Sequence, residues 1–199
     1  MKGDTGYNKE YFDEYSWNDY YLLNTAILKQ YLKIPDKAKL LDVGCGKGFH
    51  IKGWRMNGIN AEGCDPYSNL DFSWFKSASI TDLPYEDDEF DVVTCLDVLE
   101  HLKPKDILKS IQELRRVGKD LLIVQTIFSD EDSHEELWKG DKTHITWMPK
   151  SWWLEILETD KYGYILKPFE VVLPNGTVAK FPHPDQLIIT KCKRRNKKR

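Results

Sequence analysis

A cluster of three glycines follows a short apolar run in the first quarter of the chain. Gly44, Gly46 and Gly48 lie in the stretch LLDVGCGKGFH, directly after the residues that end at Val43. Glycine gives up packing and backbone entropy, so such a cluster indicates that another molecule approaches the backbone closely. A helix is expected behind it, whose free N–H groups can bind a ligand. Asp65 follows Gly44 by 21 residues, the offset at which an acid reaches ribose hydroxyls. The pattern predicts a nucleoside-binding loop.

The spacing of the glycines separates two kinds of nucleotide ligand. Dinucleotide-binding folds use GxGxxG, in which the pyrophosphate lies on the helix N-terminus. This sequence has GxGxG instead, and Asp42 precedes it. A carboxylate beside the loop would repel a pyrophosphate, whereas it would attract an ammonium group. The loop therefore favours a nucleoside ligand with an ammonium group over NAD.

Alternating strands and helices are expected to position this loop. Apolar runs predict strands at 39–43, 60–65, 76–79, 90–96 and 120–128. Periodic and capped segments predict helices at 17–34, 49–58, 97–102, 104–118 and 149–158. The first helix is expected to bury Leu22, Leu23, Ala26, Ile27 and Tyr31. Continuously apolar strands are typical of a parallel sheet covered on both faces. Segments 162–172 and 185–193 predict a closing pair of strands, joined by a turn at 174–176.

Four stretches resemble motifs of the class I S-adenosylmethionine-dependent methyltransferases, particularly the small type 11 group. LLDVGCGKG is similar to the family's first motif, and GCDPYSN to the acid after its second strand. SASITDLPYEDDEFDVVTCLDVLEHL is similar to the adenine loop and fourth strand, and ELRRVGKDLLIVQT to the fifth-strand motif. The resemblance covers about residues 38–160. It implies one α/β domain over residues 1–199: a doubly wound, Rossmann-like sheet of seven strands, mostly parallel, with an antiparallel C-terminal hairpin strand and helices on both faces.

The resemblance also implies how the cofactor, S-adenosylmethionine, is bound. Its methionine end would lie against Asp42 and the glycine loop, Asp65 would accept the ribose hydroxyls, and Pro66 would pack on the adenine. Ser79 stands where many relatives have Asp, so adenine recognition would depend on the backbone amide of Ile80. The full predicted cofactor site is Asp42, Gly44, Cys45, Gly46, Gly48, Asp65, Pro66, Ser79, Ile80 and Leu96.

Two histidines are the predicted catalytic residues. Methyl transfer is a direct displacement, so the protein mainly aligns the acceptor and excludes water. A hydroxyl acceptor also needs a general base, and His suits neutral pH. His101 follows the fourth strand, beside the expected methyl group, and His144 comes from a later loop. The competing interpretation is that His101 only caps and packs its helix.

No metal ion is expected, but one alternative has a definite ligand set. Asp97, Glu100 and His101 have helical spacing that turns them toward one face, and His144 could join them. Some methyltransferases of small RNA ends and of quinone precursors use a similar ExxEH pattern. The shorter Asp97 replaces the first Glu here and weakens the match.

Two aromatic segments are candidates for acceptor binding. The predicted substrate insertion, 129–153, contains His134, His144 and four tryptophans, which would form a wall for a sugar or a heterocycle or would anchor the segment to the core. These tryptophans are Trp138, Trp147, Trp152 and Trp153. Segment 1–34 presents the same choice between an aromatic lid over the cofactor and helix packing. Its aromatic residues are Tyr7, Tyr11, Phe12, Tyr15, Trp17, Tyr20 and Tyr21.

Charge and cysteine content narrow the expected partners and location. The basic tail, 191–199, holds seven of the 29 Lys and Arg residues and no acid, so the rest of the chain is acidic. An acidic body repels phosphates, so the tail is expected to be a solvated terminus and nucleic acid is not the expected partner. The four cysteines lack a CxxC or zinc spacing and are expected to be free. No signal peptide or membrane-spanning run is found, which predicts a cytoplasmic protein without a membrane partner.

The expected function is S-adenosylmethionine-dependent methylation of a small or medium-sized acceptor, with oxygen as the favoured atom. Two alternatives stay open. One is a nucleic-acid methyltransferase, although CLDV stands where amino-methylating enzymes of that class carry an NPPY-type motif. The other is a cofactor-binding subunit without turnover. The sequence makes no prediction of oligomeric state.

Overall fold

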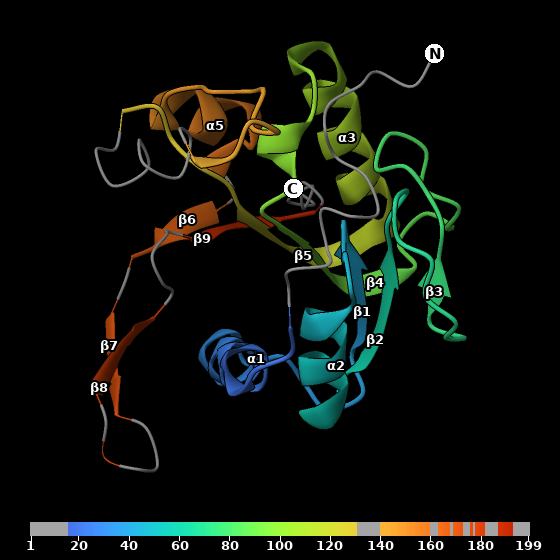
Figure 1. The fold of residues 1–199 in the computed structure, drawn as a ribbon, viewed down its shortest axis with the longest axis vertical. Helices are drawn as coiled ribbons and strands as arrows, with labels where there is room; N and C mark the ends of the chain where they lie inside the picture. Colours follow the sequence, from blue (N-terminus) through green and yellow to red (C-terminus); the bar gives the residue numbers. More distant parts are fainter. Residues whose placement is uncertain are drawn as a thin grey trace, which may run out of the picture.

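A seven-stranded sheet forms the centre of the protein (Figure 1). The computed structural model describes residues 16–130, 140–159, 163–167, 169–172, 176, 178–181 and 187–192. The strand order is β3-β2-β1-β4-β5-β9-β6, and β1 to β5 pair in parallel. β9 runs antiparallel to both of its neighbours, β5 and β6. The strands are β1 Lys39–Val43, β2 Asn60–Cys64, β3 Phe75–Lys76, β4 Phe90–Leu96, β5 Gly118–Gln125, β6 Gly163–Leu166 and β9 Leu187–Lys191. This confirms the predicted Rossmann-like sheet.

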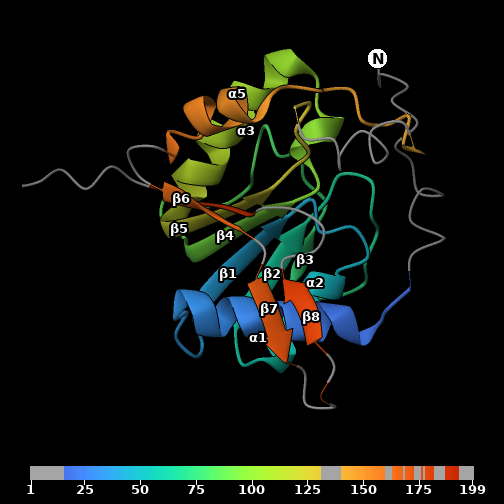
Figure 2. The same ribbon diagram turned by 90° about the vertical axis from the view of Figure 1, so that its left-hand side faces the viewer.

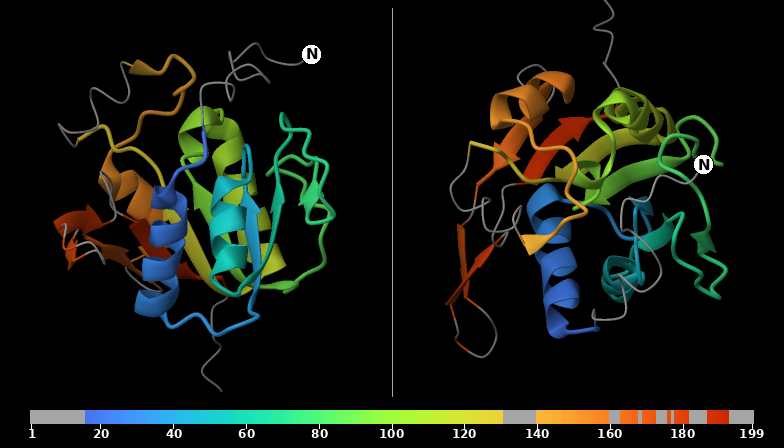
Figure 3. Two further views of the ribbon diagram at one scale, coloured as in Figure 1. Left: turned by 60° about the horizontal axis from the view of Figure 1, so that its bottom comes forward. Right: turned by 45° about the horizontal axis from the view of Figure 1, so that its top comes forward.

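Helices cover both faces of the sheet, as predicted. α1 (Asp19–Leu32) and α2 (Phe49–Met56) lie side by side on one face, as Figure 3 shows. α3 (Pro104–Val117) and α5 (Lys150–Ile156) cover the other face. Each face has its own buried apolar cluster, and neighbouring residues of one strand contribute to different clusters. Leu40 packs with the α1 and α2 side, whereas Leu41 packs with the α3 and α5 side. Burial on both faces explains why the strands are apolar at nearly every position.

The C-terminal strands are arranged differently from the prediction. The predicted strand at 162–172 is divided into β6 and β7 (Phe169–Val172), and Pro168, which cannot donate a ladder hydrogen bond, lies between them. β7 pairs with β8 (Val178–Phe181) in a separate two-stranded sheet beside α1 (Figure 2). There the ring of Phe169 stacks on the ring of Tyr31, with the two centroids 5.5 Å apart. The segment 174–176 therefore connects β7 to β8, and the prediction that it joins the two closing strands of the main sheet was wrong.

The buried face of α1 also differs from the prediction. Leu28, Asn24 and Thr25 are buried, whereas Tyr31 is 49% exposed. α1 crosses close to α2, because a Cβ on Gly53 would lie 2.6 Å from the backbone oxygen of Tyr21. Such a close approach favours small and polar side chains at the contact, where Thr25 donates to the Tyr21 carbonyl at 2.9 Å.

The segment after β4 is shorter than the predicted helix 97–102. Only Leu99–His101 form a helical turn, the 3₁₀ helix η2, and Asp97 has a left-handed backbone with φ of 55°. Within the described residues, none of the helices has the length and apolar character needed to cross a membrane.

Candidate functional site

All three glycines of the loop after β1 adopt backbone conformations that disfavour other residues. The φ values are 77° for Gly44, 51° for Gly46 and 75° for Gly48. A Cβ on Gly44 would also clash with the side chain of Val98, which follows β4. Gly48 then forms the N-cap of α2. The glycines are therefore required by the path of the loop itself, which brings its backbone to the carboxyl edge of the sheet.

Asp65 connects the glycine loop to the segment after β2. Its side chain is buried, with 1% exposure. Oδ1 accepts hydrogen bonds from the backbone N–H groups of Tyr67 at 2.7 Å and Ser68 at 2.9 Å, and Oδ2 accepts one from Gly46 at 3.2 Å. A carboxylate accepts about four such bonds, so capacity remains for a ligand hydroxyl. Asp65 thus both shapes the site and can contact a ligand.

Asp42 lies behind the glycine loop in β1. It is 3% exposed, and its Oδ1 accepts a hydrogen bond from the Thr94 hydroxyl at 2.6 Å. Burial raises the pKa of Asp42 to about 7, the Thr94 hydrogen bond opposes this shift, and the charge of Asp65 adds to it. Asp42 is therefore poised between its neutral and ionised forms near neutral pH.

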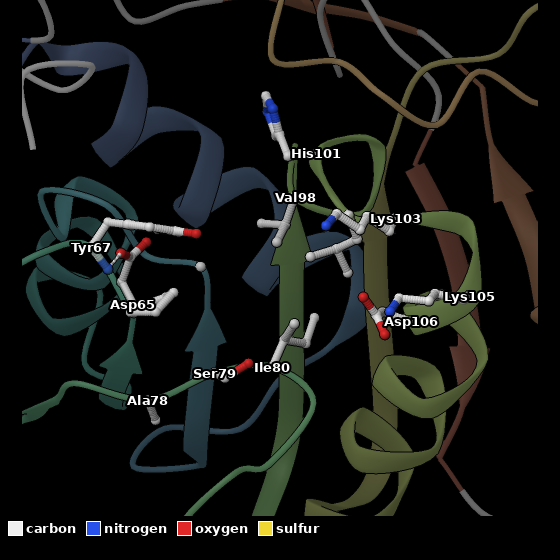
Figure 4. Close-up of a pocket in the computed structure, with 13 residues that line it drawn as sticks. Asp65, Tyr67, Ala78, Ser79, Ile80, Val98, His101, Lys103, Lys105 and Asp106 are labelled. Carbon is white, nitrogen blue, oxygen red and sulfur yellow. Dashed lines mark hydrogen bonds between the residues drawn. The ribbon is translucent and has the colours of Figure 1, made fainter. Parts of the chain in front are cut away.

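A cavity of about 270 Å³ opens at the carboxyl ends of β1, β2 and β4. In Figure 4, Asp65 and Tyr67 lie on one side of the cavity, Lys103, Lys105 and Asp106 lie on the other, and His101 lies beyond Val98. The predicted site residues that line the cavity are Gly44, Asp65, Pro66, Ser79, Ile80 and His101. The structure therefore brings the glycine loop, the acid after β2 and one of the two histidines to a single cavity.

The other predicted site residues lie around this cavity rather than on its wall. Asp42 and Gly46 are buried and do not line the cavity, and Gly48 is the N-cap of α2. Cys45 packs against Gly63, because a Cβ added to Gly63 would lie 2.9 Å from the Sγ of Cys45. Leu96 is the last residue of β4. These residues support the loop and the strand end from which the wall is built.

Several residues on the cavity wall were not singled out from the sequence. They are Tyr67, Ala78, Val98, Leu102, Lys103, Lys105 and Asp106. Most of them follow β4 or begin α3, and the segment after β4 lies at the carboxyl edge of the sheet, where such folds bind ligands. This rule could have identified the segment after β4 from the sequence. The residue types in it could not, because they are common on any protein surface.

His101 and His144 lie close together at one side of the cavity. Their ring centroids are 4.8 Å apart. The backbone N–H groups of Ile145 and Thr146 both donate to the carbonyl of Glu100 at 2.9 Å, which docks the His144 segment onto η2. Burial lowers the pKa of His101 to about 4, and the nearby His144 adds to this effect. His101 is therefore a neutral imidazole at neutral pH.

Three of the four alternative metal ligands come together. Among the described residues, ligand atoms of Glu100, His101 and His144 all lie within 4.8 Å of one another. Asp97 is not part of this group, and its Oδ2 accepts a hydrogen bond from Gln125 at 3.3 Å. Glu100, His101 and His144 could hold a divalent ion with three protein ligands. Asp97, the shorter acid that replaces the first Glu of the ExxEH pattern, would not be one of them.

The aromatic residues of the two candidate segments are only partly described. His134 and Trp138 lie outside the described residues, as do Tyr7, Tyr11, Phe12 and Tyr15. Trp153 is fully buried in the core, which supports an anchoring role, whereas Trp147 and Trp152 are half-buried. Trp17 and Tyr21 pack against Phe49 of α2, which supports helix packing for this part of the N-terminal segment.

The sequence matches the family described as a methyltransferase domain over residues 15–164. The match covers most of the chain and includes every strand from β1 to β5. The chain belongs to the class I S-adenosylmethionine-dependent methyltransferases.

Relatives of this methyltransferase act on different acceptors. A tRNA U34 carboxymethyltransferase from Pseudoalteromonas atlantica is 35% identical over 121 residues, which are 52% of this chain and 36% of the relative. A ubiquinone biosynthesis O-methyltransferase from Rickettsia bellii is 27% identical over 160 residues, which are 73% of this chain and 62% of the relative. The chain therefore covers less than two thirds of the length of either relative.

Solved structures share the fold of this methyltransferase. A putative methyltransferase from Haloferax volcanii, in complex with the Trm112 methyltransferase activator, has a TM-score of 0.64 at 15% identity over 94% of both chains. A SAM-dependent methyltransferase from Archaeoglobus fulgidus has a TM-score of 0.64 at 18% identity, over 86% of this chain and 94% of that chain.

The cavity of the methyltransferase fits the functional groups of S-adenosylmethionine. Asp65 can accept from a ribose hydroxyl, and Ser79 and Ile80, at which the family resemblance places the adenine, line the same cavity. The buried carboxyl of Asp42 lies near the loop expected to hold the ammonium group. An ammonium ion favours the ionised form of a nearby carboxyl and lowers its pKa.

The methyltransferase is therefore expected to bind its cofactor less tightly as the pH falls below 7. Above its pKa of about 7, Asp42 is ionised and would attract the ammonium group of a cofactor bound at the glycine loop. Below this pH, binding must first remove a proton from Asp42, so affinity should fall by up to about tenfold per pH unit. Calorimetric titration from pH 5.5 to 8.5 measures this slope. Asp42→Asn should flatten it, and an equally steep slope in that variant would assign the effect to another group.

Proposed function

We propose that this enzyme transfers a methyl group from S-adenosylmethionine to a hydroxyl oxygen of a small or medium-sized acceptor, such as a sugar or a heterocycle. The observation that supports this most is that Gly44, Asp65 and His101 line one cavity. The first two are suited to the cofactor, and the third is suited to removing a proton from the acceptor.

Each part of the cavity has a proposed role in holding the cofactor. Asp42 and the glycine loop hold its methionine end, Asp65 accepts from the ribose hydroxyls, and Pro66 packs on the adenine. Ser79 and Ile80 contact the edge of the adenine. Cys45, Gly46, Gly48 and Leu96 act through the backbone and packing that keep this wall in place. When bound, the cofactor supplies a methyl group on a positively charged sulfur.

His101 is proposed as the general base. Its neutral imidazole accepts the hydroxyl proton as the new O–CH₃ bond forms and the S–CH₃ bond breaks. The positive charge that leaves the sulfur thus ends on the imidazolium, and the sulfur product is a neutral thioether. The lowered pKa of His101 keeps it unprotonated at neutral pH, although it also makes the histidine a weaker base. His144, which packs beside His101, would shape the acceptor side of the site.

Transfer of a labelled methyl group tests the acceptor class. The enzyme would be incubated with methyl-tritiated S-adenosylmethionine and, separately, with hydroxylated aromatic compounds, sugars and bulk tRNA. Label in one of the small hydroxylated acceptors, released as an ether, is the expected result. Label in tRNA alone would overturn the proposal of a small acceptor.

A nucleic-acid acceptor is the second candidate, because the chain is similar to tRNA U34 carboxymethyltransferases. In that case the basic tail 191–199 would contact phosphates. β9 runs antiparallel to β5, and Cys192 donates to the carbonyl of Asp120 near the start of β5, so the chain leaves the sheet at the edge opposite the cavity. This placement disfavours the tail as part of the acceptor site. If the acceptor is a small molecule, deleting 193–199 should leave its methylation unchanged. If the acceptor is tRNA, the same deletion should weaken methylation.

Chelation separates a general base from a metal-assisted reaction. We expect EDTA to leave activity intact, because neutral His101 can accept the proton without an ion. The test compares initial rates before and after dialysis against EDTA, with S-adenosylmethionine binding as the control for intact fold. Loss of activity that added Mg²⁺ or Zn²⁺ restores would instead assign Glu100, His101 and His144 to a metal site.

A further inference from the structure

His101 is the first member of a short hydrogen-bond chain that the proposed function does not use. Its Nδ1 lies 2.8 Å from the hydroxyl oxygen of Thr143. The same hydroxyl oxygen lies 2.6 Å from Oδ1 of Asp141. The backbone N–H of Thr143 also donates to that Oδ1, at 2.8 Å. Three residues from two distant parts of the chain are thus connected atom to atom.

The direction of each hydrogen bond follows from counting protons. Asp141 accepts at Oδ1 from the Thr143 N–H, and an aspartate carboxylate has no proton to give. The Thr143 hydroxyl has one proton and must donate it to Asp141, and the 2.6 Å distance is typical of a hydroxyl bound to a carboxylate. Toward His101, Thr143 can therefore only accept. The proton on a neutral His101 must be on Nδ1.

We propose that Thr143 and Asp141 are positioning residues that hold His101 in the tautomer with the proton on Nδ1. The lone pair is then on Nε2, which becomes the atom that accepts the proton of the acceptor hydroxyl. The assignment of the tautomer rests on the hydrogen bonds above and needs neither a bound acceptor nor a bound cofactor. Its role in turnover rests on the proposed function of His101 as the base.

The surroundings of Thr143 indicate that this arrangement is rigid. Thr143 is 7% exposed. Two residues further on, the backbone of Ile145 donates to Glu100, and the Thr146 hydroxyl donates to the Leu102 carbonyl, so η2 is held on both sides of His101. The bond between the Thr143 backbone and Asp141 would by itself make a local turn. That turn does not need a hydroxyl aimed at a histidine 42 positions earlier in the chain.

Nitrogen NMR measures the tautomer directly and needs no acceptor. Protonated and unprotonated imidazole nitrogens differ widely in ¹⁵N chemical shift, and His101→Gln identifies the signals of His101 among the five histidines. At pH 8 the wild-type protein should show a protonated Nδ1 and an unprotonated Nε2. Thr143→Val, which keeps the shape but loses the hydroxyl, should shift the population toward the proton on Nε2. Thr143→Ser should restore the wild-type pattern.

A second variant and a rate measurement keep the proposal open to contradiction. Asp141→Ala frees the Thr143 hydroxyl proton, so it should shift the tautomer in the same direction as Thr143→Val. A wild-type spectrum with the proton on Nε2, or a Thr143→Val spectrum identical to wild type, would overturn the tautomer assignment. With an acceptor in hand, Thr143→Val should lower kcat about tenfold without changing cofactor affinity. A shifted tautomer with unchanged kcat would overturn the positioning role, while methyl transfer itself would stand.

Discussion

Gly44→Val is expected to abolish cofactor binding, with a loss of affinity of about 10²-fold or more. The φ of 77° at this position costs a residue with a side chain about 1–2 kcal/mol, and a branched one more. The new Cβ would also clash with Val98. Both residues line the cavity, so relieving the clash pushes one side chain or the other into the space the ligand needs. Calorimetry with S-adenosylmethionine gives the affinity, and thermal unfolding shows that the variant is folded.

Gly140→Val is the matched control for this substitution. A Cβ on Gly140 would have no neighbour within 4 Å, and its φ is not in the left-handed region. The same glycine-to-valine change there should leave cofactor affinity within about twofold of wild type. If Gly44→Val unfolds cooperatively and still binds as tightly as the control, the glycine loop is not part of the cofactor site.

His101→Ala is expected to slow methyl transfer by about 10²-fold or more, the usual contribution of a general base. Cofactor affinity should change little, because His101 lies at the side of the cavity away from Asp65 (Figure 4). Single-turnover rates at saturating cofactor and acceptor measure the effect on the chemical step. Binding of S-adenosylmethionine to the same variant measures the effect on the cofactor site.

His50→Ala is a useful comparison, because His50 is the other described histidine whose pKa is lowered to about 4 by burial. It lies in α2, where its ring is 5.0 Å from that of Tyr21, and it does not line the cavity. Removing it should reduce stability without a comparable loss of rate. Equal rate losses in the two variants would mean that His101 acts through packing, which is the alternative weighed from the sequence.

The parts of the fold that were predictable are those in which the local pattern has one physical explanation. Phe90–Leu96 is apolar at nearly every position because both faces of β4 are buried, and its bounds were predicted correctly. Helix α3 begins at a proline and ends before Gly118, as capping preferences require. The mostly parallel, Rossmann-like character of the sheet followed from the family resemblance and from the alternation of strands and helices.

The parts that were not predictable depend on contacts between distant segments. Tyr31 was placed in the core because it fits the apolar period of α1, yet the approach of α2 at Gly53 decides which side of α1 is buried. Phe169 was assigned to one long strand, whereas it begins a separate strand that packs on that same Tyr31. A single-sequence pattern contains neither helix-to-helix distances nor the pairing of short strands.

The candidate site shows the same division. The glycine loop and Asp65 could be predicted because their spacing in the sequence reflects a fixed turn geometry. The threefold hydrogen bonding of Asp65 to backbone N–H groups could not, since it depends on how two loops meet. Thr143 and Asp141 carry no motif of their own, and they become notable only when the chain brings them to His101.

The position of β9 has a consequence for the synthesis of the protein. β6 pairs only with β9 among the described strands, and β9 separates β6 from β5. On the ribosome, the edge of β5 at residues 121–124 therefore stays unpaired until residues 187–191 emerge. At 5–20 residues per second, the interval from the end of β5 to the start of β9 lasts about 3–12 s. During this interval an apolar strand edge is open to other nascent chains, so premature termination before β9 should yield an aggregating product rather than a smaller folded one.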